Sequence, residues 1–188
     1  MLAKAEKTYP YLKFQKCLIP DELDSLENYD LIFSNACLHW IPDHESFLPK
    51  LMSKLNDGGM LAVQMPLVQE AMFYKLLNRL ISEGKWKKLS VIHNFHNLTP
   101  NETYDILSRV SNDTTMWDTT YYHVVPSYDS VIEWYKGSGL RPYLEMLSPA
   151  EKSEFLSDLL AVIKREYPVQ ADDRVILKMP RLFFTAVK

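Results

Sequence analysis

The sequence predicts an α/β fold built around a parallel pair of β-strands. Two apolar segments, residues 31–40 and 60–66, have the composition of strands that are covered on both faces. The apolar spacing of residues 44–55, which lie between these segments, predicts a helix. Two buried strands that are joined through a helix form a right-handed β-α-β unit, so the chain should carry a parallel sheet with helices against it.

The elements that precede this unit are short. Residues 1–7 have the composition of the end of a helix, which Pro10 terminates. Residues 11–19 alternate between apolar and polar side chains in their first half, and this pattern predicts a short strand. The acidic residues 20–30 then connect this strand to the first buried one.

Capping and turn residues mark the remaining boundaries. Asp43 is placed to cap the helix, and the glycines of "NDGG", residues 56–59, permit the positive backbone dihedral angles of a helix C-cap. Further elements are expected at residues 69–82 (helix), 99–110 (a helix opened by Thr99-Pro100), 116–126 (strand), 127–137 and 148–167 (helices), and 174–188 (a strand that Pro180 interrupts, or two strands).

Length and composition exclude several classes of protein. The 188 residues suit one domain, and 47% hydrophobic with 24% charged residues is typical of a globular protein. The formal net charge of −3 excludes a global field that would attract nucleic acid or an anionic membrane. No apolar run approaches the roughly 18 residues that span a bilayer, so a cytoplasmic location is expected. Cys17, Cys37, His93 and His96 lack the spacing of metal ligands, and no metal site is expected.

Several segments of the sequence resemble a known enzyme family. Residues 30–66, "DLIFSNACLHWIPDHESFLPKLMSKLNDGGMLAVQMP", resemble the central segment of class I S-adenosylmethionine-dependent methyltransferases. The resemblance continues through "YDILS", "MWDTTYYHVVPS", "EWYKGSGLRPYLEML" and "MPRLFF", and "GSGLRPYL" with "PRLFF" is specific to the trans-aconitate methyltransferases. It implies a Rossmann-like sheet, S-adenosyl-L-methionine as cofactor, and transfer of a methyl group to a carboxylate oxygen of a small polycarboxylate, which forms the monomethyl ester of trans-aconitate.

The resemblance also implies that part of the family pattern is missing. Family members bind the cofactor through a glycine-rich loop after strand 1, whereas the first glycine of this chain is Gly58. Residues 1–188 are therefore expected to be a single C-terminal portion of a methyltransferase domain, with strands 3 to 7 present, strands 1 and 2 absent, and a helical substrate-side insertion within residues 67–148. Leu18 stands where an acidic residue usually contacts the adenine. Weak or absent cofactor binding is expected, and activity of this chain alone stays open.

Two other functions remain compatible with the sequence. The first is a methyltransferase of the same fold that acts on another small carboxylate. The second is a non-catalytic remnant that serves as a binding module.

The expected chemistry needs cations but no catalytic dyad. A carboxylate, with an ordinary pKa near 4, is ionised at neutral pH, so no general base and no catalytic residue is expected. Arginine holds carboxylates through two parallel hydrogen bonds, and Arg141 and Arg181 stand in turn or apolar contexts. Each arginine is expected either to bind substrate or to act structurally, in an ion pair or as a clamp on backbone carbonyls.

The other candidate site residues follow from where the strands end. Open α/β sheets bind ligands beyond the carboxyl ends of their strands, and the first buried strand ends in the sequence "SNACLHW". Trp40 is expected to form a wall of the substrate pocket or a lid over the next helix. His39 is expected to hydrogen-bond the cofactor or the substrate, or to be a structural histidine. Ser34, Asn35 and Ala36 are expected to contact the cofactor. Tyr121 and Tyr122 alternate along a strand, and Tyr122 is the one expected to face the substrate.

The family's strand order predicts an unusual sheet edge. This order, by resemblance, is 3-2-1-4-5-7-6, so the loss of strands 1 and 2 leaves residues 31–37 as an open apolar edge. Unpaired backbone groups on such an edge favour pairing with another strand. Either residues 11–17 are expected to pair there, or a second chain docks on the edge and gives a dimer.

Overall fold

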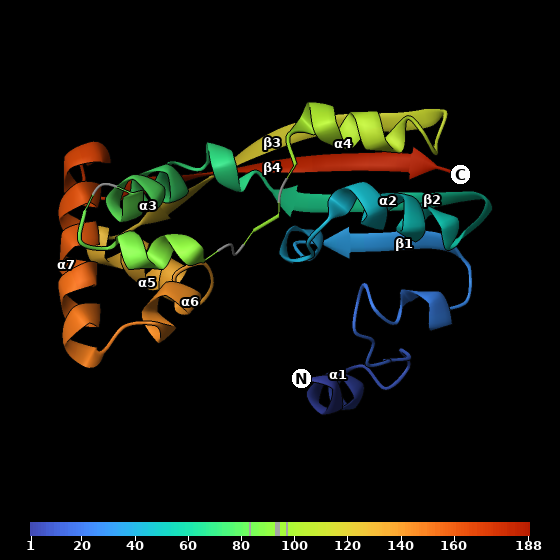
Figure 1. Ribbon diagram of the computed structural model, residues 1–188, viewed down its shortest axis with the longest axis horizontal. Helices are drawn as coiled ribbons and strands as arrows, with labels where there is room; N and C mark the ends of the chain where they lie inside the picture. Colours follow the sequence, from blue (N-terminus) through green and yellow to red (C-terminus); the bar gives the residue numbers. More distant parts are fainter. Residues whose placement is uncertain (83, 93–94, 97) are drawn as a thin grey trace.

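A four-stranded sheet forms the centre of the protein, seen in a computed structural model that describes residues 1–82, 84–92, 95–96 and 98–188. The strands lie in the order β1-β2-β4-β3 (Figure 1). Their bounds are Tyr29–Asn35 for β1, Leu55–Pro66 for β2, Asp113–Val125 for β3 and Val175–Val187 for β4. β1 and β2 are parallel, whereas β4 runs antiparallel to both β2 and β3. This is the order implied for family strands 4, 5, 7 and 6, so the predicted fold class is confirmed.

Helices α2 (His44–Ser53) and α4 (Pro100–Leu107) cover one face of this sheet (Figure 1). Asp43 caps α2 as predicted, because its side chain accepts a hydrogen bond from the backbone N–H of Ser46 at 3.4 Å. Thr99 begins α4 in a capping box with Glu102. The two helices and the sheet enclose a hydrophobic core that includes Phe47, Leu48, Leu51, Met52, Leu61, Val63, Ile106, Leu107, Leu182 and Phe184.

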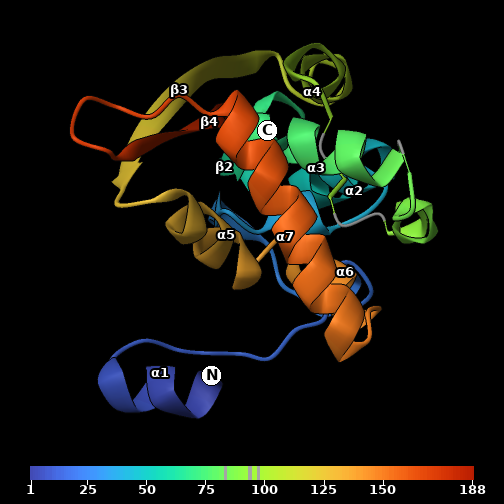
Figure 2. The same ribbon diagram turned by 90° about the vertical axis from the view of Figure 1, so that its left-hand side faces the viewer.

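A second hydrophobic core lies in a helical lobe. The lobe stands at one end of the sheet in Figure 1, and its helices face the viewer in Figure 2. The lobe contains α3 (Met72–Ser82), α5 (Tyr128–Lys136), the unpredicted α6 (Arg141–Glu145) and α7 (Pro149–Glu166). Its core includes Phe73, Leu77, Val131, Tyr135, Leu140, Phe155, Leu159, Ile163, Val175 and Leu177. The lobe therefore differs from the expected insertion at residues 67–148, because α7 belongs to the lobe whereas α4 packs on the sheet.

β4 continues through Pro180 as one strand. β3 pairs with β4 over residues 175–187, whereas β2 pairs only with residues 181–187. The carbonyl of Pro180 accepts a hydrogen bond from the Leu67 N–H at 3.0 Å, so this proline's backbone faces the side where β2 has just ended. Proline has no N–H to donate to a neighbouring strand. Because β2 does not extend along this side of Pro180, the missing N–H breaks no sheet hydrogen bond.

Three local predictions are wrong. Residues 11–19 form no strand: the sheet contains four strands among the described residues, and none lies beside this segment to share backbone hydrogen bonds. Residues 56–59 lie within the first part of β2 instead of capping α2. β1 ends at Asn35, so His39 and Trp40 lie in a short 3₁₀ helix, Leu38–Trp40. Other 3₁₀ helices span Leu23–Ser25, Val68–Glu70 and Lys87–Val91, and α1 spans Leu2–Thr8.

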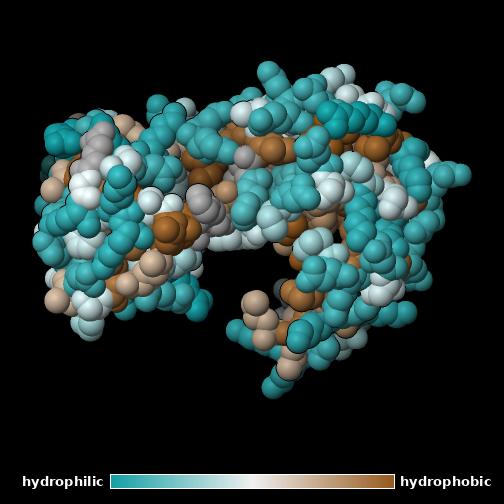
Figure 3. All heavy atoms as spheres, viewed as in Figure 1, coloured by the Kyte–Doolittle hydropathy of each residue, from teal (hydrophilic) through white to brown (hydrophobic). Residues whose placement is uncertain are grey.

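β1 is an edge strand with exposed apolar side chains. In the described part of the chain β1 pairs only with β2. The expectation that residues 11–17 pair with this edge is therefore wrong. Leu31 is 57% exposed and Phe33 is 70% exposed. Figure 3 shows hydrophobic surface where Figure 1 places β1, beside the gap that separates the sheet from the N-terminal segment.

We expect a second copy of the chain to occupy this edge. Two identical strands related by a twofold axis can pair antiparallel, and β1 carries one charged residue, Asp30, to oppose such pairing. The wild type should therefore be dimeric or larger in multi-angle light scattering, and Phe33→Lys should shift it toward the monomer. Tyr11→Lys changes an aromatic residue that is 78% exposed and lies off the sheet, so this control should leave the mass unchanged. A monomeric wild type with fast hydrogen exchange across β1 would contradict the expectation.

Candidate functional site

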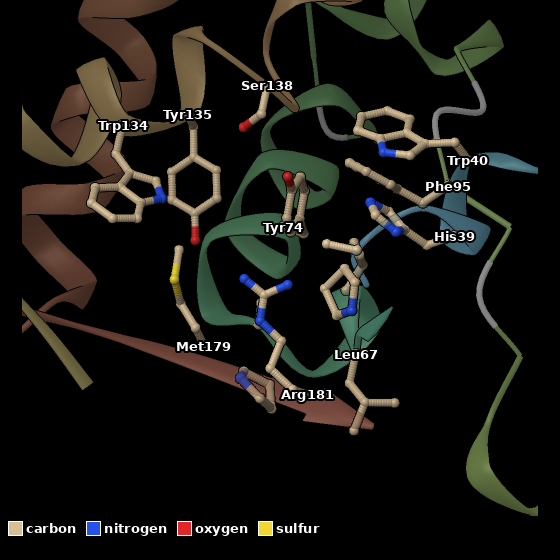
Figure 4. Close-up of a pocket in the computed structure, with 15 residues that line it drawn as sticks. His39, Trp40, Leu67, Tyr74, Phe95, Trp134, Tyr135, Ser138, Met179 and Arg181 are labelled. Carbon is tan, nitrogen blue, oxygen red and sulfur yellow. The ribbon is translucent and has the colours of Figure 1, made fainter. Parts of the chain in front are cut away.

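A cavity opens where β1 and β2 end and the helical lobe begins. Its volume is about 250 Å³, close to the lower end of small-molecule pockets, which span roughly 300–1,000 Å³. Figure 4 shows its lining, which comprises Ala36, His39, Trp40, Pro66, Leu67, Val68, Ala71, Tyr74, Phe95, Trp134, Tyr135, Ser138, Met179, Pro180 and Arg181. The position agrees with the general rule that open α/β sheets bind ligands beyond the carboxyl ends of their strands.

Five of the fifteen lining residues are phenylalanine, tyrosine or tryptophan. The Phe95 ring lies against Trp40, with centroids 4.8 Å apart, and against Tyr74, at 5.0 Å. Tyr135 stacks on Phe73 with centroids 3.5 Å apart, which fixes the Tyr135 ring on the opposite side of the cavity. These contacts give the cavity an apolar, largely preformed surface.

Arg181 supplies the positive charge of the cavity. It is the one lysine or arginine among the lining residues, and it forms no ion pair with any described residue. Its position on β4, opposite Pro66 of β2, places its guanidinium at the cavity floor (Figure 4). A guanidinium in apolar surroundings that lacks a carboxylate partner is suited to an anionic ligand.

His39 is buried and neutral at physiological pH. Burial, followed by the charges of Arg181 and His44, lowers the pKa of His39 from 6.5 to about 4. Its backbone carbonyl accepts a hydrogen bond from the N–H of His96 at 3.0 Å, and its ring lies 4.8 Å from that of Trp40. The ring atom Nδ1 is buried and has no hydrogen-bond partner among the described residues. His39 therefore offers an uncharged polar group to a ligand.

The turn after β1 places Ala36 and His39 at the cavity. Ala36 has a positive φ of 51°, and its N–H donates to the carbonyl of Gln64 at 2.9 Å, which turns the chain away from the sheet. Ser34 and Asn35 precede this turn and do not line the cavity. The buried Ser34 Oγ has no hydrogen-bond partner within the described ranges.

The structure brings together half of the expected site residues. Trp40, Arg181, Ala36 and His39 line the cavity, whereas Ser34 and Asn35 lie beside it. The other two expected residues, Arg141 and Tyr122, lie on the surface.

Arg141 and Tyr122 are held elsewhere by their own neighbours. The Arg141 side chain is 73% exposed and pairs with Glu145 one helical turn away, at 2.7 Å. Tyr122 is 61% exposed, and the Nζ atom of Lys178 lies 5.8 Å from its ring centroid. Tyr121, not Tyr122, shares the sheet face of Arg181, because it pairs with Met179 two residues along β4. We therefore do not retain Arg141 or Tyr122 as cavity residues.

Eleven of the fifteen lining residues were not predicted as site residues, and those with aromatic or hydroxyl side chains are Tyr74, Phe95, Trp134, Tyr135 and Ser138. The last three lie in "EWYKGSG", within a segment that carries the family resemblance, so that segment held a usable signal. Tyr74 lies within an amphipathic helix and Phe95 within an irregular segment, where no local pattern marks them.

Some features are absent from the described residues. No group of three or more histidine, cysteine, aspartate or glutamate side chains gathers as metal ligands there, although His93 lies outside these residues. None of the helices within the described ranges is long and apolar enough to cross a membrane.

Comparison with known proteins identifies relatives along the whole chain. The trans-aconitate 2-methyltransferase of Yersinia pestis is 35% identical over 189 residues, which cover 99% of this chain and 73% of that protein. The protein of the same name from Escherichia coli O157:H7 is 35% identical and matches 99% of this chain and 72% of its own length. No family model matches. Among solved structures, the YcgJ protein from Bacillus subtilis shares the fold with a TM-score of 0.54 at 14% identity, covering 99% of this chain and 76% of that one.

The neutral state of His39 predicts a pH-dependent stability. His39 takes up a proton near pH 6.5 in the unfolded chain but only near pH 4 in the folded chain. The free energy of unfolding should therefore fall as the pH falls from 6.5 to 4. Allowing for partial screening by solvent, His39 should contribute about 2 kcal/mol to this loss. Denaturant unfolding of the wild type and His39→Gln at pH 7.5 and 4.5 measures the difference. An equal pH dependence in both proteins would show that His39 is not buried as a neutral group.

Proposed function

This chain belongs to the trans-aconitate 2-methyltransferase family, and we propose that it is an S-adenosylmethionine-dependent carboxyl O-methyltransferase that forms the monomethyl ester of trans-aconitate. The observation that carries the proposal is the single arginine of a mainly apolar cavity at the strand ends. Such a cavity combines one anchor for a carboxylate with surfaces that exclude water.

Hydroxyl groups add neutral donors around Arg181. Burial raises the pKa of Tyr135 to about 12 and raises the pKa of Tyr74 still further, so both phenols keep their protons at neutral pH. Figure 4 shows Tyr74, Tyr135 and Ser138 on the same cavity as Arg181. Arg181 would hold one carboxylate through its planar fork, and these hydroxyls would donate to the substrate's remaining oxygens.

The acceptor needs orientation more than activation. Its carboxylate is ionised at neutral pH and is already a nucleophile, so no residue has to remove a proton. The contribution of the protein is to hold the reacting oxygen in line and to keep water out, which Trp40, Phe95 and Tyr135 would do as cavity walls.

The turn after β1 fits part of the cofactor. When bound, S-adenosylmethionine supplies an electrophilic methyl group on a sulfonium centre. Ser34 Oγ and His39 Nδ1 are buried polar atoms without hydrogen-bond partners in the described part of the chain, and they would satisfy a polar ligand beside Ala36. Trp40 would pack on the same ligand from the cavity side.

Removing Arg181 should selectively weaken acceptor binding. Losing a buried charge-assisted contact costs about 2–5 kcal/mol, so Arg181→Ala should raise the dissociation constant for trans-aconitate by about 30-fold or more. Arg141→Ala is the matched control, because Arg141 pairs with Glu145 on the surface, and it should leave this constant unchanged. Isothermal titration calorimetry measures both without requiring turnover. Equal effects of the two substitutions would remove Arg181 from the substrate site.

Cofactor binding by these 188 residues should be weaker than micromolar. The position that resembles the adenine contact carries Leu18, which is 61% exposed, and the first glycine is Gly58. Titration with S-adenosylmethionine and S-adenosylhomocysteine tests this expectation, with trans-aconitate binding as a control for a folded cavity. Micromolar affinity for either nucleoside would contradict it.

Product analysis tests the reaction itself. Millimolar S-adenosylmethionine with trans-aconitate should yield the monomethyl ester by mass spectrometry, and a panel of other small di- and tricarboxylates in the same assay shows whether another acceptor is preferred. Binding of a carboxylate without any ester would favour a binding module over an enzyme.

A further inference from the structure

Tyr74 lies between two cavities. The second cavity, of about 270 Å³, is lined by Val68, Gln69, Tyr74, Lys75, Asn78, Ile92, Phe95 and Tyr143. Three of these residues, Val68, Tyr74 and Phe95, also line the cavity that contains Arg181. The aromatic rings of Tyr74 and Phe95 meet edge to face with centroids 5.0 Å apart, so together they form a partition between the two spaces.

The Tyr74 ring has little freedom to move. It also contacts Phe73 and Tyr135 edge to face, with centroids 5.4 Å away in both cases. All three neighbouring rings meet it at steep interplanar angles, between 73° and 88°. The partition is therefore held from several sides.

Gly139 makes room for this ring. A Cβ atom at Gly139 would lie 2.1 Å from the Tyr74 hydroxyl oxygen, 2.8 Å from Cζ and 2.9 Å from Cε1, which are distances that real atoms do not tolerate. The backbone cannot easily retreat, because the next residue, Leu140, is fully buried and donates its N–H to the carbonyl of Tyr135 at 2.9 Å. Any side chain at position 139 must therefore displace Tyr74.

We propose that Tyr74 is a specificity-determining wall of the acceptor pocket and that Gly139 is the residue that positions it. The inference rests on the proposed function. With the wall in place, the pocket accepts a compact, acyclic polycarboxylate whose anchor is Arg181. Without the wall, the two cavities join, and a carboxylate that bears a ring-sized apolar substituent can extend toward Ile92 and Tyr143.

The test compares two probes, trans-aconitate and phenylsuccinate, by calorimetry. Tyr74→Ala should improve the dissociation constant for phenylsuccinate relative to that for trans-aconitate by on the order of tenfold, because it vacates the space of one ring. Tyr74→Phe keeps the ring, so it should bind phenylsuccinate no more tightly than the wild type does, and the loss of the hydroxyl donor should only weaken trans-aconitate binding. Tyr74→Leu fills more of the space and should give an intermediate ratio, which keeps the test decisive if Tyr74→Ala does not fold.

The role of Gly139 is tested separately. Gly139→Ala should change the ratio of the two dissociation constants, whereas Gly137→Ala should not, because no atom lies within 4 Å of a Cβ at Gly137. In the Tyr74→Ala background the Gly139→Ala substitution should have no further effect, since the ring that it would displace is gone. A full additional effect in that background would overturn the positioning role.

The outcomes separate this inference from the proposed function. Tight trans-aconitate binding with an unchanged ratio in Tyr74→Ala would overturn the wall and leave the proposed function intact. Failure of the wild type to bind trans-aconitate, together with phenylsuccinate binding gained in Tyr74→Ala, would overturn the proposed substrate and support the wall. Binding of neither probe by any variant would overturn both.

Discussion

The site depends on the pairing of one strand, β4, with partners on both sides. Its second half lies between β2 and β3 and contributes Leu182 and Phe184 to the core beneath α2 and α4. Its first half pairs with β3 alone and contributes Val175 and Leu177 to the core of the lobe. The two cores therefore share one rigid element. Arg181 lies where the two halves meet, which is why the charge of the cavity stands at the junction of sheet and lobe.

The electrostatic character of the cavity follows from what surrounds this charge. Apolar surroundings screen a charge less than water does, so an anion bound to Arg181 would interact with it strongly. The same surroundings keep His39 neutral, and the two phenols at the cavity retain their protons because burial disfavours their ionised forms. One cation among neutral donors distinguishes an anionic ligand from an uncharged one. Such a cavity suits a reaction whose acceptor arrives already ionised.

The shape of the cavity depends on contacts between residues that are distant in the sequence. Tyr74 comes from α3, Phe95 from the segment before α4, and Gly139 from the turn between α5 and α6. Buried neighbours anchor two of these segments, Phe73 in α3 and Leu140 in the turn. A change at any one of the three would alter the pocket without touching Arg181. The shape of the cavity therefore depends mainly on residues of the lobe, whereas its positive charge comes from Arg181 on β4 of the sheet.

The sequence by itself determined the features that depend on local chemistry. Asp43 and the Thr99-Glu102 pair mark helix starts through hydrogen bonds to residues three positions away, and the apolar runs of β1 and β2 identify a β-α-β unit. Motif resemblance, another property of sequence, led to the family, and four of the eight site residues expected from the sequence line the cavity. Tertiary structure alone decided which of two similar arginines faces the cavity, because Arg141 finds Glu145 on its own helix and Arg181 finds no such partner among the described residues. Tertiary structure also decided that residues 11–19 form no strand, because a strand requires a neighbour to pair with. It placed Tyr74 beside Gly139 as well, because these residues are 65 positions apart in the chain and only packing brings them together.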